Sequence, residues 1–335
     1  GDDACESPSE VDCNFANCDY SEQVLRTMKS GSFSDQAIKF GFLHESEYWY
    51  MSIDHQQIGK DFRADLGFMT KADYQKTEAI LDRYFYGDES SWWSEFALYG
   101  EWNIKHNENG EFLEKTYAVG AGVNGPMLSY FEYYAYQSDK VGLRHDESML
   151  AIDDNTTLFN LDYMNVNGSF QPRPDLYSEF SYEWGDRIDY SNNRRGEHYE
   201  FNAGITYNLT KHLELDYSFT TSQLDAKSIE NGINNYVYKA RLDELRLTYQ
   251  FDVKSYLKLN LVYSDIDRNP ANNPFVSVSK TNKDLSTQLI YAYKLNPQTV
   301  FFLGYSDNSL QDDLLNSLER KERTFFTKIS YAWMK

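Results

Sequence analysis

Hydrophobic and polar residues alternate strictly along residues 243–264, DELRLTYQFDVKSYLKLNLVYS. In an extended chain this alternation places the two kinds of residue on opposite faces. One face carries Leu245, Leu247, Tyr249, Phe251 and Val253, followed after a turn at Lys254 and Ser255 by Leu257, Leu259, Leu261 and Tyr263. The pattern predicts two long antiparallel strands joined by a very short turn.

The same alternation recurs from Ala37 to the end of the chain and predicts about 15 strands. Short turns are predicted near residues 45, 89, 125, 172, 210, 254 and 296, and long polar loops near residues 60, 107, 146, 191, 228, 274 and 313. Short and long connections therefore alternate. This asymmetry is typical of outer-membrane barrels, which have tight periplasmic turns and longer extracellular loops. A soluble sandwich does not require it.

The predicted fold class is an all-β, antiparallel transmembrane β-barrel with about 14–16 strands, formed by residues 36–335. Residues 1–35 are predicted to be a polar, Cys-containing loop or arm. Single-chain bacterial barrels have an even number of strands. An odd count predicts a larger barrel, completed by upstream strands or another envelope protein. The alternative is that the number of strands is miscounted between Met69 and Tyr86, or that a further short strand lies near Gln23 to Met28.

The amino-acid composition supports a protein surface that lies at the boundary between lipid and water. Aromatic residues make up 16% of the chain, with 28 Tyr and 21 Phe, and such rings suit membrane interfaces. No apolar run approaches the roughly 18–20 residues that a membrane helix needs. The aromatics predicted to face outward near strand ends are Trp92, Trp102, Trp184, Tyr249, Tyr263, Tyr291 and Trp333. In a soluble sandwich the same rings would form the core.

The formal net charge of −20 argues against a nucleic-acid partner. It fits acidic external loops, and the predicted partners are outer-membrane lipid and lipopolysaccharide. The only cysteines, Cys5, Cys13 and Cys18, lie near the N-terminus with no histidine nearby. They allow one disulfide with one free thiol, or a metal site. The polar first residues are not a signal peptide, so either one has been removed or the chain begins within a longer precursor.

The polar face of the predicted strands would line the barrel lumen. The residues assigned to it are Glu95, Glu101, Glu179, Glu183, Glu214, Asp216, Glu244, Arg246, Lys258 and Lys294, together with Lys39, Asp252 and Lys328. One interpretation is a cation-preferring pore or a sugar-binding wall. The other is that these charges pair across the lumen and only solvate or plug it.

The sequence does not predict an enzymatic activity. Paired carboxylates such as Glu214 and Asp216 can perform acid–base work on a glycoside, but in a chain with 52 acidic residues such pairs arise by chance. No HExxH, GxSxG, P-loop or CxxC motif occurs. We therefore expect no catalytic residue, no cofactor and no metal site.

Two segments resemble a known family. Phe62 to Phe68, FRADLGF, and Tyr293 to Asp307, YKLNPQTVFFLGYSD, are similar to the C-terminal barrel of bacterial envelope proteins that carry an N-terminal carbohydrate-binding-family-nine-like domain. The similarity runs from about Ala37 to the end of the chain. The resemblance implies an outer-membrane location and a glycan-related role, and it supplies no catalytic residues.

These observations together predict a bacterial outer-membrane β-barrel that acts as a pore, an anchor or a surface-binding scaffold, with a glycan as a further partner. The alternative is a soluble all-β domain that binds carbohydrate or hydrolyses glycans.

Overall fold

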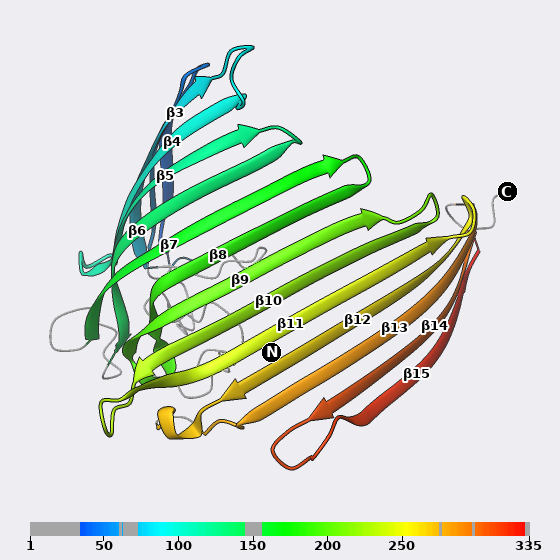
Figure 1. Cartoon of the computed structure of the whole chain (residues 1–335). Coiled ribbons are helices and arrows are strands. Elements are labelled where there is room, and N and C mark those ends of the chain that lie inside the picture. Colours follow the sequence, from blue (N-terminus) through cyan, green and yellow to red (C-terminus); the bar gives the residue numbers. More distant parts are fainter. Residues whose placement is uncertain are drawn as a thin grey trace. The chain divides into compact units, whose positions relative to one another are not determined.

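The computed structural model describes residues 34–59, 62, 73–144, 156–274, 277–296 and 299–331. These residues form a fifteen-stranded sheet in which every strand lies beside its neighbour in the sequence. Figure 1 shows β10 to β15 side by side in chain order. The predicted all-β, antiparallel fold with 14 to 16 strands is confirmed.

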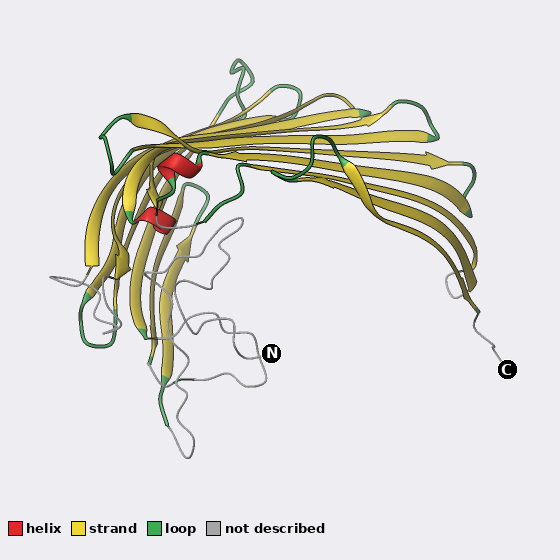
Figure 2. Ribbon diagram, turned by 90° about the horizontal axis from the view of Figure 1, so that it is seen from below, coloured by secondary structure: helices red, strands yellow, loops and turns green. Residues whose placement is uncertain are grey.

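The strands are β1 (Ala37–Glu45), β2 (Trp49–Ile58), β3 (Tyr74–Tyr86), β4 (Glu95–His106), β5 (Phe112–Gly125), β6 (Ser129–Arg144), β7 (Thr156–Arg173), β8 (Leu176–Asp189), β9 (Arg194–Asn208), β10 (Leu213–Lys227), β11 (Asn234–Gln250), β12 (Ser255–Arg268), β13 (Thr281–Asn296), β14 (Thr299–Gln311) and β15 (Glu319–Ser330). Two 3-10 turns, η3 (Tyr190–Asn192) and η4 (Pro270–Asn272), are the helical elements of the described residues, and Figure 2 draws them in red among the strands. Neither is long and apolar enough to cross a membrane.

The described strands group into two compact units. The first holds the chain up to Val123 with Glu132–Met164 and Gly185–Gly196. The second holds Asn124–Phe131, Asn165–Trp184 and Glu197–Lys335.

Large apolar side chains are exposed on one face of the sheet, whereas a water-soluble protein would bury them. On inner strands of the first unit Ile53 is 54% and Leu81 49% exposed, and on an inner strand of the second unit Leu303 is 49% exposed. The register pairs Phe42 with Ile53, and Tyr305 with Phe325, so each apolar row continues onto the next strand. The described residues therefore leave the apolar face without a covering layer.

Small buried clusters lie on the opposite, polar face. In the first unit Phe159, Leu161 and Ile188 pack together, and in the second unit Leu224, Ala226 and Val237 do so. The first cluster lies at the start of β7 and the end of β8, and the second at the end of β10 and the start of β11.

Several predicted boundaries were wrong. The predicted long loops near residues 107 and 191 are tight, because β4 and β5 are joined by residues 107–111 and β8 and β9 by residues 190–193. The strands run further than the apolar pattern suggested; β7 has 18 residues and β11 has 17. The single strand predicted between Met69 and Tyr86 is β3.

The turn between β11 and β12 also differs from its prediction. β11 ends at Gln250, so Phe251, Val253 and Asp252 lie in the turn, and Asp252 does not belong to the polar wall. The Asp252 carboxylate accepts hydrogen bonds from the backbone N–H groups of Lys254 and Ser255, at 2.7 and 2.8 Å. These N–H donors, Lys254 first, lower the pKa of Asp252 and hold it charged in the turn.

Predictions for the arm 1–35, its three cysteines, a strand near Gln23 to Met28, most of the segment Phe62 to Phe68, and Trp333 fall almost wholly outside the described residues.

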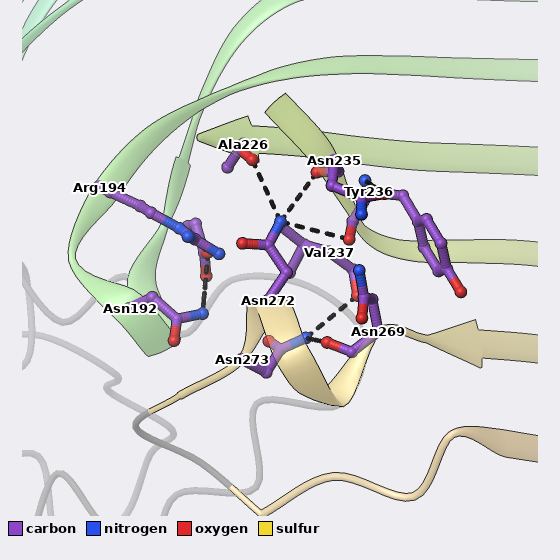
Figure 3. Close-up of polar contacts among 10 residues, drawn as sticks. Asn192, Arg194, Ala226, Asn235, Tyr236, Val237, Asn269, Asn272 and Asn273 are labelled. Carbon is purple, nitrogen blue, oxygen red and sulfur yellow. Dashed lines mark hydrogen bonds and ion pairs between the residues drawn. The ribbon is translucent and has the colours of Figure 1, made fainter. Parts of the chain in front are cut away.

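The loop between β12 and β13 is fastened to the hairpin of β10 and β11 by two asparagines (Figure 3). The amide Nδ2 of Asn272 donates to the backbone carbonyls of Ala226, Asn235 and Tyr236, at 3.1, 2.8 and 3.3 Å. Asn273 donates to the carbonyl of Val237 at 3.1 Å. Asn272 is 2% exposed. These amides donate to backbone carbonyls at the adjoining ends of β10 and β11.

Replacing Asn272 with alanine is expected to destabilise the protein by about 1 to 3 kcal/mol, because the buried carbonyl of Ala226 and the half-buried carbonyls of Asn235 and Tyr236 lose a donor. Urea unfolding in lipid vesicles measures the change. Asn109→Ala, at an exposed turn position, is the control and should change stability by less than about 0.5 kcal/mol. Equal effects of the two substitutions would contradict this role of Asn272.

Candidate ligand-binding face

The register places the predicted polar residues of the second unit on one face. Asp216 of β10 lies directly opposite Thr206 of β9 and Arg246 of β11. Arg246 in turn lies opposite Asn260 of β12. By the same pairing and alternation, Glu214, Glu244 and Lys258 share that face with Asp216 and Arg246. Lys294 of β13 also lies on this face. Ala292, two residues before it, pairs with Tyr256, which is two residues before Lys258 in β12.

A shallow hollow of about 180 Å³ lies on this face. The polar side chains that line it are Tyr177, Glu179, Thr206, Asp216, Ser218, Glu244, Arg246 and Asn260. The hollow therefore brings together four of the residues predicted from the sequence, on β8, β10 and β11. Glu214, Lys258 and Lys294 lie on the same face but do not line it.

Hydrogen bonds fix the orientation of the carboxylates in the hollow. Thr206 Oγ1 donates to Asp216 Oδ1 at 2.8 Å, and the Tyr177 hydroxyl donates to Glu179 Oε2 at 3.0 Å. Gly204 gives Glu179 room, because a Cβ at this position would lie 3.2 Å from Glu179 Cγ. The hollow thus presents oriented carboxylate oxygens to a ligand.

The charge of the hollow is unbalanced. Glu179, Asp216 and Glu244 face one guanidinium, Arg246, which makes no ion pair among the described residues. The Nδ2 of Asn260 donates to Gln288 at 3.1 Å, and its Oδ1 is buried without a partner in the described part of the chain. Such a surface attracts cations and solutes that donate hydrogen bonds.

Sequence reasoning missed Gly204, Thr206, Ser218 and Asn260 because it selected charged residues alone. The alternation along each strand could have found them, because Thr206 and Asn260 alternate with apolar residues in the same way as Asp216 does.

In the first unit, Glu101 pairs with Ile80, and Glu95 with Tyr86, on the face opposite Trp102 and Leu98. Glu101 is also near Asp82 and Glu132. The predicted residues Glu95 and Glu101 therefore lie on a polar face of their own unit. Whether these polar faces enclose a lumen stays a prediction.

Glu183, whose side chain is partly exposed, contacts the buried pair of His198 and Ser222. Its Oε1 lies 3.6 Å from His198 Nδ1, and His198 Nε2 lies 3.0 Å from Ser222 Oγ. The order carboxylate, imidazole, hydroxyl is that of nucleophilic triads. However, Ser222 is 8% exposed and its hydroxyl also lies 3.3 Å from the Tyr238 hydroxyl. We interpret the network as mutual satisfaction of buried polar groups.

Most of the predicted outward aromatics lie on or beside the apolar face. Tyr249, Tyr263 and Tyr291 have its parity, Trp102 pairs with Ala79 on the apolar side of β4, and Trp184 stacks on the half-exposed Tyr182 at 5.0 Å. Trp92 is instead in the turn between β3 and β4 and is 70% exposed.

The apolar face of the second unit ends in a row of tyrosines followed by charged pairs. The Tyr217 hydroxyl donates to Asp243, and the Tyr263 hydroxyl donates to Asp265, at 2.7 and 3.2 Å. Beyond them Arg241 pairs with Asp243 at 2.6 Å, and Lys283 with Asp265 at 2.9 Å. The side chains therefore change from apolar to amphipathic to charged along the strands.

At the opposite end of the strands, aromatic rings gather beside the short turns. In the first unit the Arg83 guanidinium lies over the rings of Tyr48, Trp49 and Phe85, about 5 Å from each. In the second unit Phe251 lies 4.9 Å from Tyr249 and 6.2 Å from Tyr291. The apolar face thus has an aromatic border at this end as well.

Comparison with known proteins gave structural similarity alone. No protein-family model matches the sequence, and no curated protein matches it. The ferric enterobactin receptor (PfeA) of Pseudomonas aeruginosa, in a variant form, aligns with a TM-score of 0.42 and 13% identity over 82% of this chain and 50% of that chain. The same receptor in complex with BCV-L6 aligns with a TM-score of 0.43 and 14% identity over 83% and 51%. The chain spans about half the length of these receptors, and values this low carry no argument about function.

Proposed function

We propose that the chain is the membrane-spanning part of a bacterial outer-membrane β-barrel, with the apolar face toward lipid and the polar face toward a water-filled lumen. The observation that carries this proposal is the order of side chains on the apolar face. A band of aliphatic side chains lies between aromatic rows, with ion pairs such as Arg241–Asp243 beyond one of them. An apolar band flanked by two aromatic girdles is the outer surface of a transmembrane barrel.

Strand lengths fit this orientation. A barrel strand needs about 10 residues to cross the membrane, and β7 to β14 have 13 to 18 residues each. The excess would extend past the headgroups, where the charged pairs lie. Asp265 with Lys283, and Asp307 with Arg320, would then face outer-membrane lipid and lipopolysaccharide headgroups.

The runner-up, a soluble all-β domain, would leave Ile53, Leu81 and Leu303, which lie on inner strands, in water at 54%, 49% and 49% exposure. Continuous exposed apolar surface of this kind marks a membrane or protein contact. Fractionation tests the choice: the proposal expects the protein in the membrane fraction, released by detergent and shifted in mobility by heating on a gel. Recovery from the soluble fraction without detergent would overturn it.

The polar face supports passage or binding of polar solutes, with cations preferred. Three carboxylates and one guanidinium line the hollow, and a concave wall of one dominant sign raises the local concentration of counter-ions. A pore can be tested directly, by measuring conductance. If no conductance is found, the proposal that remains is an anchor or a surface-binding scaffold. A glycan-related role also belongs to this proposal.

Neutralising the carboxylates Asp216 and Glu244, as Asp216→Asn with Glu244→Gln, is expected to lower the ratio of cation to anion permeability several-fold. Arg246→Ala is expected to raise it and to leave assembly intact. Reversal potentials in planar bilayers measure both changes. Asp265→Asn, on the outer face, is the control and should leave the ratio unchanged. If conducting channels form and all variants keep the wild-type ratio, the polar face does not line the pathway.

A further inference from the structure

Charged side chains of alternating sign lie beyond the tyrosines on the apolar face of the second unit. They belong to three neighbouring strands, and we call them the charged patch: Lys239, Arg241 and Asp243 on β11, Asp265 and Asp267 on β12, and Lys283 on β13. In the register Lys239 lies opposite Asp267. Asp265 lies between Arg241 and Lys283 and is opposite both. Each cation of the patch therefore faces a carboxylate on the next strand.

The charged patch lies at the end of these strands that carries the longer connection. Asp265 follows Tyr263 by two residues, so it lies on the same face as that tyrosine. Residues 269–280 join β12 to β13 at this end, whereas residues 251–254 join β11 to β12 at the other. In the proposed orientation the patch is therefore level with the headgroups of the outer leaflet.

The cations of the charged patch have donors to spare. The side chain of Arg241 is 56% exposed and that of Asp243 17%. Asp243 accepts hydrogen bonds from Nε and Nη2 of Arg241 at 2.6 and 3.0 Å, which uses two of the five N–H donors of a guanidinium. The Lys283 ammonium contacts Asp265 at 2.9 Å, and Lys239 is exposed. Arg241 and the two lysines thus keep N–H donors for a ligand.

Alternating charges over three strands suit a headgroup that carries several phosphates and the cations between them. Lipopolysaccharide has such a headgroup, because divalent cations bridge the phosphates of neighbouring molecules. Arginine and lysine bind phosphate oxygens, and Mg²⁺ is commonly held by one or two carboxylates together with phosphates. From β11 to β13 the patch spans two strand spacings, about 9.6 Å. A glycerophospholipid such as phosphatidylglycerol presents a single phosphate to this surface.

We propose that the charged patch binds the phosphorylated headgroup of lipopolysaccharide. The side chains of Lys239, Arg241 and Lys283 contact its phosphates, and those of Asp265 and Asp267 contact the divalent cations that bridge them. The inference rests on the proposed function and deepens it, because the patch meets a lipid headgroup only if the apolar face lies in the membrane. It assigns the contact with the outer leaflet to a defined set of side chains.

A purely structural role of the charged patch makes a different expectation. Opposite charges on adjacent strands stabilise a sheet without any ligand, and in that case removing a cation changes stability and leaves lipid binding as it was. Lys258 and Lys294 provide the comparison, because they lie on β12 and β13 as well but on the polar face.

The test is titration of the full chain, in detergent with Mg²⁺, against fluorescent lipopolysaccharide, followed by fluorescence anisotropy. The wild type is expected to bind it, and unlabelled phosphatidylglycerol should compete at least tenfold more weakly than unlabelled lipopolysaccharide. Arg241→Gln with Lys283→Gln should weaken binding about tenfold, the loss expected for two partly exposed ionic contacts. Lys258→Gln with Lys294→Gln removes the same charge from the polar face; it is the matched control and should bind as the wild type does. Chelating Mg²⁺ with EDTA should weaken wild-type binding several-fold.

The heat-shift gel, run on every preparation, separates the two proposals. A folded, heat-modifiable protein that does not bind lipopolysaccharide, or that binds phosphatidylglycerol equally well, overturns the lipopolysaccharide inference and leaves the barrel proposal standing. Equal weakening by the two double substitutions also overturns it, as does binding that EDTA leaves unchanged. A protein that shows no heat shift and needs no detergent contradicts the barrel proposal, whatever lipid it binds.

Discussion

Replacing Leu259 with lysine is expected to destabilise the membrane-inserted protein by about 2 to 4 kcal/mol. Leu259 lies within the apolar face of β12, opposite Leu247 on β11 and Leu289 on β13. A charge there would sit in hydrocarbon, near the middle of the band between the aromatic rows. The same cost is expected for Leu247→Lys. Reversible urea unfolding in lipid vesicles, followed by the heat-shift gel, measures it.

The control for this substitution places the same charge on the other face. Ser218 lies on the polar face of β10, directly opposite Glu244 and Gly204. Ser218→Lys should cost less than about 1 kcal/mol, because the ammonium gains a carboxylate neighbour and keeps its water. Equal losses for Leu259→Lys and Ser218→Lys would contradict the assignment of the two faces.

Replacing Gly185 with alanine is expected to cost about 2 to 5 kcal/mol, from backbone strain and overpacking together. Gly185 of β8 has a φ of +134°, a conformation that residues with a Cβ rarely adopt. A Cβ there would lie 2.4 Å from the Asp162 carbonyl oxygen and 2.5 Å from Tyr163 Cα. These are backbone atoms of the neighbouring strand, so relief requires the strands to move.

Gly232 provides the comparison for Gly185. Its φ is +68°, and a Cβ there would meet nothing within 4 Å. Gly232→Ala should therefore show the strain of a positive φ alone, about 1 to 2 kcal/mol. Unfolding in vesicles measures both variants, and a Gly185→Ala protein as stable as Gly232→Ala would show that β7 and β8 are not packed as described.

Alternation along single strands was enough to predict the architecture. In the hairpin of β11 and β12, for example, Leu245, Leu247 and Tyr249 alternate with Glu244 and Arg246. Each strand predicted from this pattern was found. Strand ends were less predictable. Beyond Asp243 and Asp265 the outer face becomes charged, so both faces are polar and the periodic signal disappears while the strand continues.

The candidate site needed information that one strand does not contain. The parity of Asp216 and Arg246 follows from the sequence, but their direct opposition depends on the register between β10 and β11. The stacked tyrosines Tyr99, Tyr134, Tyr136 and Tyr163 were missed for another reason. Aromatic residues were assigned to the lipid boundary as a class, although Tyr134 and Tyr136 share their parity with Glu132 and therefore belonged on the polar face.

The lipid exposure of successive residues along β12 tests the central claim most directly. Single cysteines at residues 257–263, in a chain whose Cys5, Cys13 and Cys18 are replaced by serine, would carry a fluorophore, and nitroxide-labelled lipid would quench it. The account predicts strong quenching at positions 257, 259, 261 and 263 and weak quenching at 258, 260 and 262. Uniform quenching, or quenching strongest at 258, 260 and 262, would contradict it.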